Sequence, residues 1–225
     1  MSIVIASSYS SNINQLLLLL KTTIYEEIIV IKRKEDLTLE NLTNINPRYV
    51  FFPHWSYFIP SEIHLNFNCI VFHMTDLPYG RGGSPLQNLI VRGHKTTKVS
   101  AIKVVEGIDE GPIYLKKELS LEGAANEIFK RCIPIVQSMI IEIISQALVP
   151  IQQEGEIVNF QRRKPCQSDI RELDSLEDIY NYIRMLDAKG YPNAYIENQK
   201  IKFNFSRVKK TKNNELVAYV RISKK

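Results

Sequence analysis

The strongest constraint on the fold is a series of short apolar runs, rich in β-branched residues, that recurs along the first third of the chain. Each run has the length of a buried strand rather than of a helix. Segments of helical or loop length separate the runs, and this alternation is typical of a parallel sheet with helices on both faces. The runs occupy residues 3–6, 28–31, 49–52 and 69–72.

One long amphipathic helix is expected over residues 125–148, and one more strand over residues 98–105. Pro134 lies inside the helix and should bend it. We therefore predict an α/β fold, a Rossmann-like, mostly parallel sheet with helices on both faces. The apolar residues that recur at helical spacing, and that we expect in the core, are Ile128, Cys132, Val136, Met139, Ile143 and Ala147.

The composition changes after Pro150, where residues 152–156 form a polar linker. Beyond it, the pattern predicts a helix over residues 176–186 and strands around residues 201–205 and 216–222. We therefore predict a catalytic domain over residues 1–150 and a small C-terminal α+β domain over residues 151–225.

The three cysteines show no paired spacing, which argues against a disulfide framework or a zinc site and fits a reducing compartment. Cys69 and Cys132 lie in apolar runs and are expected to be buried thiols. The chain starts without a basic leader, and the leucines at residues 16–20 are too few to cross a bilayer. We expect a cytoplasmic protein with no membrane partner and no metal.

The net charge of +5 is concentrated at the C-terminus. Residues 200–225 contain nine Lys and Arg residues but only one acid, Glu215. Such a segment can hold a polyanion, either nucleic acid or the diphosphate of a nucleotide-linked substrate. A solvated strand surface would account for the same charges.

A segment with two prolines and three glycines, residues 78–85, follows the fourth apolar run. This composition predicts a loop without regular structure. Ser84 followed by Pro85 is typical of a helix start, with the serine as N-cap and the proline in the first turn.

Two residues that could carry chemistry follow predicted strands. His73 directly follows the fourth apolar run, and Asp109 lies in a glycine-flanked turn after the next strand. Ligands of open α/β sheets bind at the carboxyl ends of the strands. We therefore expect His73 and Asp109 to face each other at this edge as a general acid/base pair.

Residues 73–87 resemble the motif of 10-formyltetrahydrofolate formyltransferases, which reads Asn-x-His-x-Ser-Leu-Leu-Pro, then Arg-Gly, then Pro-Ile-Gln. Residues 107–113 resemble the Gly-Val-Asp-Thr-Gly segment of that family, at the matching distance. Residues 55–60 are similar to the loop that holds the pterin. The resemblance covers residues 45–150 and loosely extends to the N-terminal strands.

The resemblance implies transfer of a formyl group from 10-formyltetrahydrofolate, the co-substrate, to an amine. His73, oriented by Asp109, would stabilise the oxyanion or move a proton, and Thr75 would assist. Asp109 would also order a water that relays the proton. The residues implied to bind the folate are Tyr57, Phe58, Ile59, Arg81, Val104, Val105, Gly107 and Ile108.

The sequence departs from the family at one catalytic position, where Val71 replaces the asparagine that binds the formyl oxygen. Losing such a donor typically costs on the order of a hundredfold in rate. Thr75, Asn88 or backbone N–H groups are the candidate replacements.

Residues 183–194 and 160–165 are similar to segments of sugar-nucleotide N-formyltransferases. We therefore expect the acceptor to be a nucleotide-linked amino sugar used for bacterial surface glycan, with nucleic acid not a partner, and the chain could form a homodimer. Methionyl-tRNA is the alternative acceptor, and glycinamide ribonucleotide fits the layout less well. A catalytically inactive folate- or RNA-binding protein would also account for Val71 and the basic C-terminus.

Overall fold

The computed structural model describes residues 1–8 and 10–225, and these residues group into two compact units. The first unit contains Met1–Gly82, Thr97–Leu119 and Arg131–Asn159. The second contains Gly83–Thr96, Ser120–Lys130 and Phe160–Lys225. The predicted division into domains of residues 1–150 and 151–225 stays a prediction.

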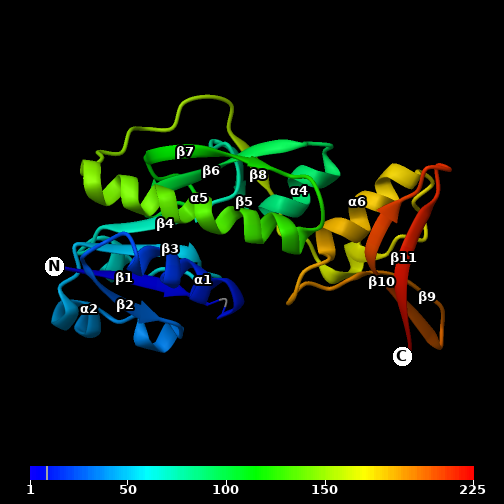
Figure 1. Ribbon diagram of the computed structural model, residues 1–225, viewed down its shortest axis with the longest axis horizontal. Helices are drawn as coiled ribbons and strands as arrows, with labels where there is room; N and C mark the ends of the chain where they lie inside the picture. Colours follow the sequence, from blue (N-terminus) through cyan, green and yellow to red (C-terminus); the bar gives the residue numbers. More distant parts are fainter. Residues whose placement is uncertain (9) are drawn as a thin grey trace. The chain divides into compact units, whose positions relative to one another are not determined.

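A six-stranded sheet with the order β2-β1-β3-β4-β6-β7 forms the centre of the first unit (Figure 1). β1 pairs in parallel with β2 and β3, and β3 pairs in parallel with β4. The predicted α/β fold with a mostly parallel sheet is therefore confirmed. The strands are β1 (Ser2–Ser7), β2 (Glu27–Ile31), β3 (Tyr49–His54), β4 (Cys69–His73), β6 (Thr96–Lys103) and β7 (Ile113–Ser120).

β6 runs antiparallel to β4, so that His73 pairs with Ser100 and Ile70 pairs with Lys103. The carboxyl end of β6 therefore lies beside the amino end of β4, at the opposite edge from His73. The expectation that Asp109 follows a strand end at the same edge as His73 was wrong. Asp109 comes close to His73 only because residues 104–112 form a long connection after β6.

Three helices connect the parallel strands: α1 (Ser10–Lys21), α2 (Leu39–Ile45) and α3 (Ser61–His64). A short 3-10 helix, η1 (Lys34–Asp36), precedes α2. The Thr38 hydroxyl caps α2 by accepting a hydrogen bond of 3.2 Å from the Asn41 N–H. The helix ends at Asn46, which adopts a left-handed conformation with φ 49°.

The predicted strands form the core of the first unit. Ile3, Val4 and Ile5 are completely buried, as expected for strands covered on both faces. Cys69 and Cys132 are buried too, as predicted, and burial raises the pKa of each thiol to about 12. Cys166 is exposed.

The predicted long helix is α5 (Ala125–Gln146). The Lys117 ammonium on β7 lies 2.7 Å from the Glu142 carboxylate of α5, and the Gln137 side chain donates to the Leu19 carbonyl of α1 at 3.3 Å. The predicted core residues of the helix are buried, except that Ala147 is exposed. Ala147 ends the helix in a left-handed conformation with φ 47°, which turns its side chain off the apolar stripe.

The glycine- and proline-rich segment is more regular than predicted, because Tyr79–Gly82 form a short strand, β5. β5 pairs with β8 (Val158–Phe160) in a two-stranded sheet. Gly80 and Gly82 have φ of 85° and 98°, which glycine adopts without strain. β5 is a strand because it pairs with β8, a segment far away in the sequence, and local composition does not predict such a pairing.

The next helix, α4 (Pro85–Val91), begins where Ser84 and Pro85 predicted a helix start. The Ser84 side chain does not cap it, however. Instead, the Ser84 hydroxyl accepts a hydrogen bond of 3.1 Å from the Arg163 N–H, in the same unit.

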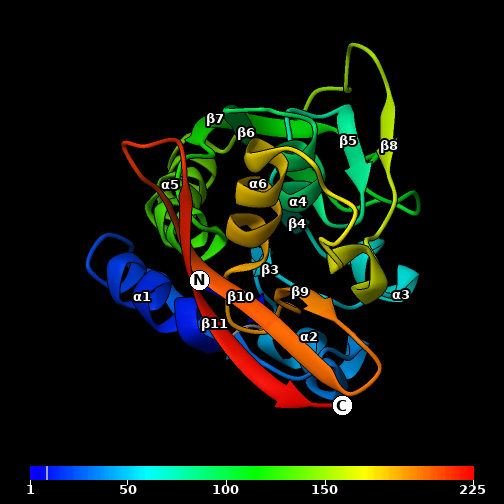
Figure 2. The ribbon, with the colours of Figure 1, turned by 90° about the vertical axis from the view of Figure 1, so that its right-hand side faces the viewer.

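The C-terminal part of the second unit has the predicted α+β content (Figure 2). Ser175 caps α6 (Leu176–Leu186), and two acids lie in the first turn, where their negative charge interacts favourably with the helix dipole. A three-stranded sheet of order β11-β10-β9 follows, and both pairings are antiparallel. Its strands are β9 (Ala194–Glu197), β10 (Ile201–Lys210) and β11 (Leu216–Lys224), and the 3-10 helix η2 (Pro165–Ser168) precedes α6.

Among the described residues, no helix has both the length and the apolar character needed to cross a membrane.

Candidate active site

His73 lies between two hydrogen-bond acceptors. Its Nε2 is 2.8 Å from the Gly80 carbonyl oxygen, and its Nδ1 is 3.4 Å from Oδ2 of Asp109. A carbonyl and a carboxylate can only accept, so the ring satisfies both when each nitrogen carries a proton. The side chain is 10% exposed, which leaves little contact with water. The structure thus brings the two predicted residues together, while their catalytic roles stay predictions.

Asp109 is held in an unusual conformation at this point. Its φ is 56°, in the left-handed region that residues with a Cβ rarely adopt. The same carboxylate oxygen that faces His73 also accepts a hydrogen bond of 2.9 Å from the Gly82 N–H. The glycines of β5 therefore supply a backbone partner to each member of the pair, Gly80 to His73 and Gly82 to Asp109.

The connection that carries Asp109 is fixed at both ends on the first unit. The Val104 N–H donates to the Cys69 carbonyl at 2.9 Å, and the Lys103 N–H donates to the Pro112 carbonyl at 2.9 Å. A Cβ on Gly111 would lie 1.7 Å from the Lys103 carbonyl oxygen, so only glycine fits there. The chain can therefore return to β6 at Gly111, where the two backbones lie in contact.

The two side chains considered as replacements for the missing asparagine donor are both engaged. Thr75 is completely buried, and its hydroxyl donates to the Gly80 carbonyl at 3.3 Å. Asn88 donates through Nδ2 to the carbonyls of Gly83 and Gln161, each at 2.9 Å. In this arrangement the donors of Thr75 and Asn88 are used within the protein, and so is Nε2 of His73, which shares the Gly80 carbonyl with Thr75. The remaining donors are backbone N–H groups, or Nε2 of His73 once it leaves the Gly80 carbonyl.

The residues predicted to bind the folate differ in exposure. Phe58 is 72% exposed and Ile108 is 69% exposed, and Tyr57 is about half exposed. Ile59 is instead buried in the core cluster, and Val104 packs against the same cluster. The exposed side chains of Tyr57, Phe58 and Ile108 can contact a ligand directly. Ile59 can contact a ligand only through its backbone. Val105 and Gly107 are partly buried.

Trp55 supports the exposed aromatic side chain next to it. Its ring lies edge-on to Tyr57, with the ring centroids 5.3 Å apart. The Trp55 Nε1 atom is buried and has no hydrogen-bond partner among the described residues. A buried donor without an acceptor is costly, so this atom is suited to a polar ligand atom or a water.

Arg81, also predicted to bind the folate, is tied to protein groups. Its guanidinium donates to Oε1 of Gln153 from Nε at 3.1 Å and from Nη2 at 2.9 Å, and it lies 3.3 Å from the Glu110 carboxylate. Sequence reasoning missed Gln153, because a glutamine in a polar stretch shows no pattern that marks it as part of a site. The ligand role of Arg81 stays a prediction.

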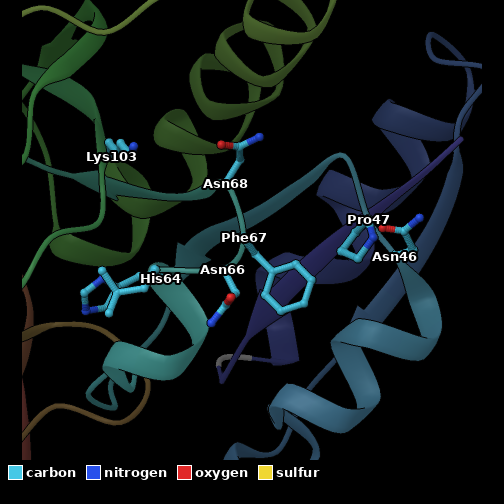
Figure 3. A pocket seen from close by; sticks show the side chains of 8 residues that line it. Asn46, Pro47, His64, Asn66, Phe67, Asn68 and Lys103 are labelled. Atoms are coloured by element: carbon cyan, nitrogen blue, oxygen red, sulfur yellow. The ribbon is translucent and has the colours of Figure 1, made fainter.

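A hollow of about 200 Å³ lies elsewhere in the first unit (Figure 3). Asn68 comes just before β4 and Lys103 ends β6, so the hollow is at the amino edge of β4, away from His73. It contains none of the predicted site residues. The residues that line it are Asn46, Pro47, His64, Leu65, Asn66, Phe67, Asn68 and Lys103.

Over residues 1–8 and 10–225, no group of three or more His, Cys, Asp or Glu side chains could hold a metal ion.

Comparison with known proteins gives a match that covers the whole chain. The solved structure of methionyl-tRNA formyltransferase from Clostridium thermocellum is 51% identical, with a TM-score of 0.96 and complete coverage of both chains. The family model for the C-terminal domain of methionyl-tRNA formyltransferase matches residues 165–223. The methionyl-tRNA formyltransferase of Thermodesulfovibrio yellowstonii is 30% identical over 73% of this chain. The chain spans only 55% of the length of that curated relative.

More distant structures share the fold alone. HypX from Aquifex aeolicus, solved in complex with tetrahydrofolic acid, is 19% identical with a TM-score of 0.77, over 96% of this chain and 40% of HypX. A sugar N-formyltransferase from Shewanella is 15% identical with a TM-score of 0.65, over 97% of this chain and 96% of that one.

Proposed function

Because the chain belongs to the 10-formyltetrahydrofolate-dependent formyltransferase family, we propose that it transfers a formyl group from 10-formyltetrahydrofolate to the amine of methionyl-tRNA. The observation that carries this proposal is the 51% identity to the Clostridium thermocellum methionyl-tRNA formyltransferase over the whole of both chains. The match of residues 165–223 to the C-terminal domain of the same enzyme supports the same acceptor.

The acceptor expected from the sequence, a nucleotide-linked amino sugar, is wrong, and so is the expectation that nucleic acid is not a partner. The Shewanella sugar N-formyltransferase is only 15% identical, which is evidence for the fold but not for the acceptor. Residues 183–194, which resembled the sugar enzymes, lie within the match to the methionyl-tRNA formyltransferase domain. That resemblance therefore reflects a shared fold.

In the proposed reaction, the unprotonated amine attacks the formyl carbon, and the carbonyl electron pair moves to the formyl oxygen. Collapse of the tetrahedral intermediate breaks the bond from carbon to folate N10. The amine loses one proton and N10 gains one. His73 would donate from Nε2 to the formyl oxygen, which would replace the Gly80 carbonyl, 2.8 Å away, as its partner. The Asp109 carboxylate, 3.4 Å from Nδ1, would stabilise the charge on the ring.

For the folate, the exposed side chains of Tyr57, Phe58 and Ile108 offer an apolar surface that a flat pterin could cover. The backbone of residues 104–108 would supply hydrogen bonds to the pterin. No step of the proposed reaction needs a metal ion.

For the tRNA, the basic hairpin of β10 and β11 offers the charge. Residues 200–225 carry nine Lys and Arg residues against one acid, and Lys209, Lys212 and Arg221 are exposed. Exposed cations grouped on one hairpin bind phosphates through a sequence-independent, salt-sensitive attraction. Tyr219, half exposed on the same hairpin, could stack on a base.

The test is formylation of methionyl-tRNA by the purified chain with 10-formyltetrahydrofolate. We expect turnover in the wild type, and His73→Ala should lower kcat/KM by about 10²–10⁴-fold, the range for a lost acid/base group. His94→Ala, which changes a half-buried histidine outside the site, is the matched control and should stay within about twofold of the wild type. Folate binding without formylation of methionyl-tRNA would contradict the proposal.

A further inference from the structure

Gln153, in the stretch that the sequence suggested to be a linker, makes four hydrogen bonds at the candidate site. Its Nε2 donates to the backbone carbonyls of Asp109 and Gly111, both at 2.8 Å. Its Oε1 accepts from Nε and Nη2 of Arg81, at 3.1 and 2.9 Å. We propose that Gln153 is a positioning residue for formyl transfer, which fixes the Asp109 turn and β5 on either side of His73. This inference rests on the proposed function.

The amide of Gln153 fits this place in one orientation only. Its oxygen faces the two donors of an arginine, which has no acceptor, and its NH₂ group faces two carbonyls, which have no donor. In a flipped amide, the NH₂ group would face the N–H donors of Arg81 and the oxygen would face the two carbonyl oxygens. Both hydrogen bonds that the NH₂ group can donate are therefore used within the site.

Gln153 holds the backbone of the Asp109 turn from outside the turn. Asp109 has φ 56°, a conformation disfavoured for a residue with a Cβ. The two donations from Gln153 bind the carbonyls on both sides of Glu110 and so hold the backbone that sets the direction of the Asp109 side chain. Asp109 in turn faces His73 at 3.4 Å.

The Arg81 side of Gln153 reaches the other partner of His73. Arg81 lies in β5 between Gly80, whose carbonyl accepts from His73, and Gly82, whose N–H donates to Asp109. Gln153 therefore joins, through one side chain, the segments that contact Nε2 and Nδ1 of His73. A displacement of about 1 Å in such groups can cost about a hundredfold in rate.

The segment that carries Gln153 is itself fixed. Ile113 and Ile151 form an antiparallel bridge with N–O distances of 2.7 and 2.9 Å, and the Val158 N–H donates to the Pro78 carbonyl at 3.4 Å. Gln153 lies between these two attachments. Its neighbour Gln152 is exposed and offers a matched control.

The first test compares Gln153→Glu with Gln152→Glu in the formylation assay. Gln153→Glu keeps the size of the side chain and the acceptor for Arg81, but it removes both N–H donors and sets a carboxylate against two carbonyls. We expect kcat to fall about 10–100-fold, with Gln152→Glu unchanged. In an Asp109→Asn background, Gln153→Glu should change kcat by less than about twofold, because this substitution keeps the acceptor for Arg81 and removes only the donations to the Asp109 turn. An equal fall in both backgrounds, or no fall in the wild-type background, would overturn the proposal.

The second test does not depend on activity. The Gly82 N–H donates to the Asp109 carboxylate, so its hydrogen exchange, followed by NMR, reports the position of that side chain. Gln153→Glu and the uncharged Gln153→Met should both accelerate Gly82 exchange about tenfold or more, whereas Val99 and Ala101 in β6 should not change. Unchanged Gly82 exchange, or failure of both variants to fold, would show that Gln153 does not act by positioning Asp109. If the wild type does not formylate methionyl-tRNA, the proposed function fails while this measurement still decides the role of Gln153.

Discussion

Val71 stands where the resemblance places the catalytic asparagine of the family, and its surroundings are apolar. It packs against both core clusters, one of which contains Leu77, Ile102 and Ile113. Val71→Asn should lower the stability by about 1–3 kcal/mol, because it places an amide without an evident partner there. If His73 and backbone groups already stabilise the oxyanion, the rate should rise by less than about tenfold. Thermal unfolding tests the expected loss of stability, and the formylation rate tests the expected change in activity. A hundredfold rise in rate would mean that the missing donor limits the enzyme.

Asp76 lies between two lysines, 2.9 Å from Nζ of Lys98 and 2.5 Å from Nζ of Lys116. Burial disfavours the ionised carboxylate, but the hydrogen bonds from Lys116 and Lys98 outweigh it and the pKa of Asp76 falls below its ordinary value of 3.8. A lowered carboxyl pKa contributes stability above the unfolded pKa, and this stability is lost as the pH falls through the folded pKa.

Asp76→Asn should therefore lower the Tm at pH 7, and this effect should shrink as the pH falls below the ordinary pKa of 3.8. The carboxylate is 41% exposed, so solvent screening limits the loss to about 1 kcal/mol, or about 2–4 °C. Asp174→Asn, at an exposed position in the second unit, should leave the Tm unchanged. A Tm difference that is the same at pH 3 and pH 7 would contradict the ion-pair explanation.

At the scale of the elements, α5 contains an internal proline on its exposed side. Pro134 has no N–H to donate to the preceding turn, and a helix-interior proline costs about 3 kcal/mol relative to alanine. Part of that cost is offset, because proline lowers the conformational entropy of the unfolded chain, which stabilises the folded state by about 0.4–1 kcal/mol. Pro134→Ala should therefore stabilise the protein by roughly 2 kcal/mol.

Calorimetry would show this gain as a Tm increase of about 4–8 °C. Ser145→Ala, also exposed on α5, is the control and should change the Tm by only about 1–2 °C. A lower Tm for Pro134→Ala would mean that the bend itself is needed for packing.

At the scale of the whole molecule, the proposed function requires a long polyanion to bind a chain whose positive charge is concentrated at its C-terminus. Lys209→Glu/Lys212→Glu reverses two exposed charges of the β10–β11 hairpin. The affinity for methionyl-tRNA should fall about tenfold or more at low salt, and the slope of log affinity against log salt should decrease by about two, one for each lost phosphate contact.

Binding measured over a range of salt concentrations tests this expectation. Lys21→Glu makes one charge reversal at the end of α1 and should leave the slope unchanged. If the double variant binds as tightly as the wild type at every salt concentration, the hairpin is only a solvated surface.

Much of the fold follows from the sequence, because strands and helices leave a local pattern. The β-branched run at residues 69–72 becomes β4, and the helical period of residues 125–148 becomes α5. The position of His73 at a strand end follows in the same way. Helices and strands can be predicted in this way because each has its own period of buried and exposed residues, which a short stretch of sequence already shows.

Tertiary structure alone decided how the site is assembled. The antiparallel direction of β6, the pairing of β5 with β8 and the hydrogen bonds of Gln153 to Asp109 join residues 27 or more positions apart. Thr75 and Asn88 carry suitable donors in the sequence, but backbone carbonyls occupy those donors in the folded chain. Local periodicity records whether a side chain is buried, whereas the partner of a polar group depends on which distant segment the packed core brings beside it.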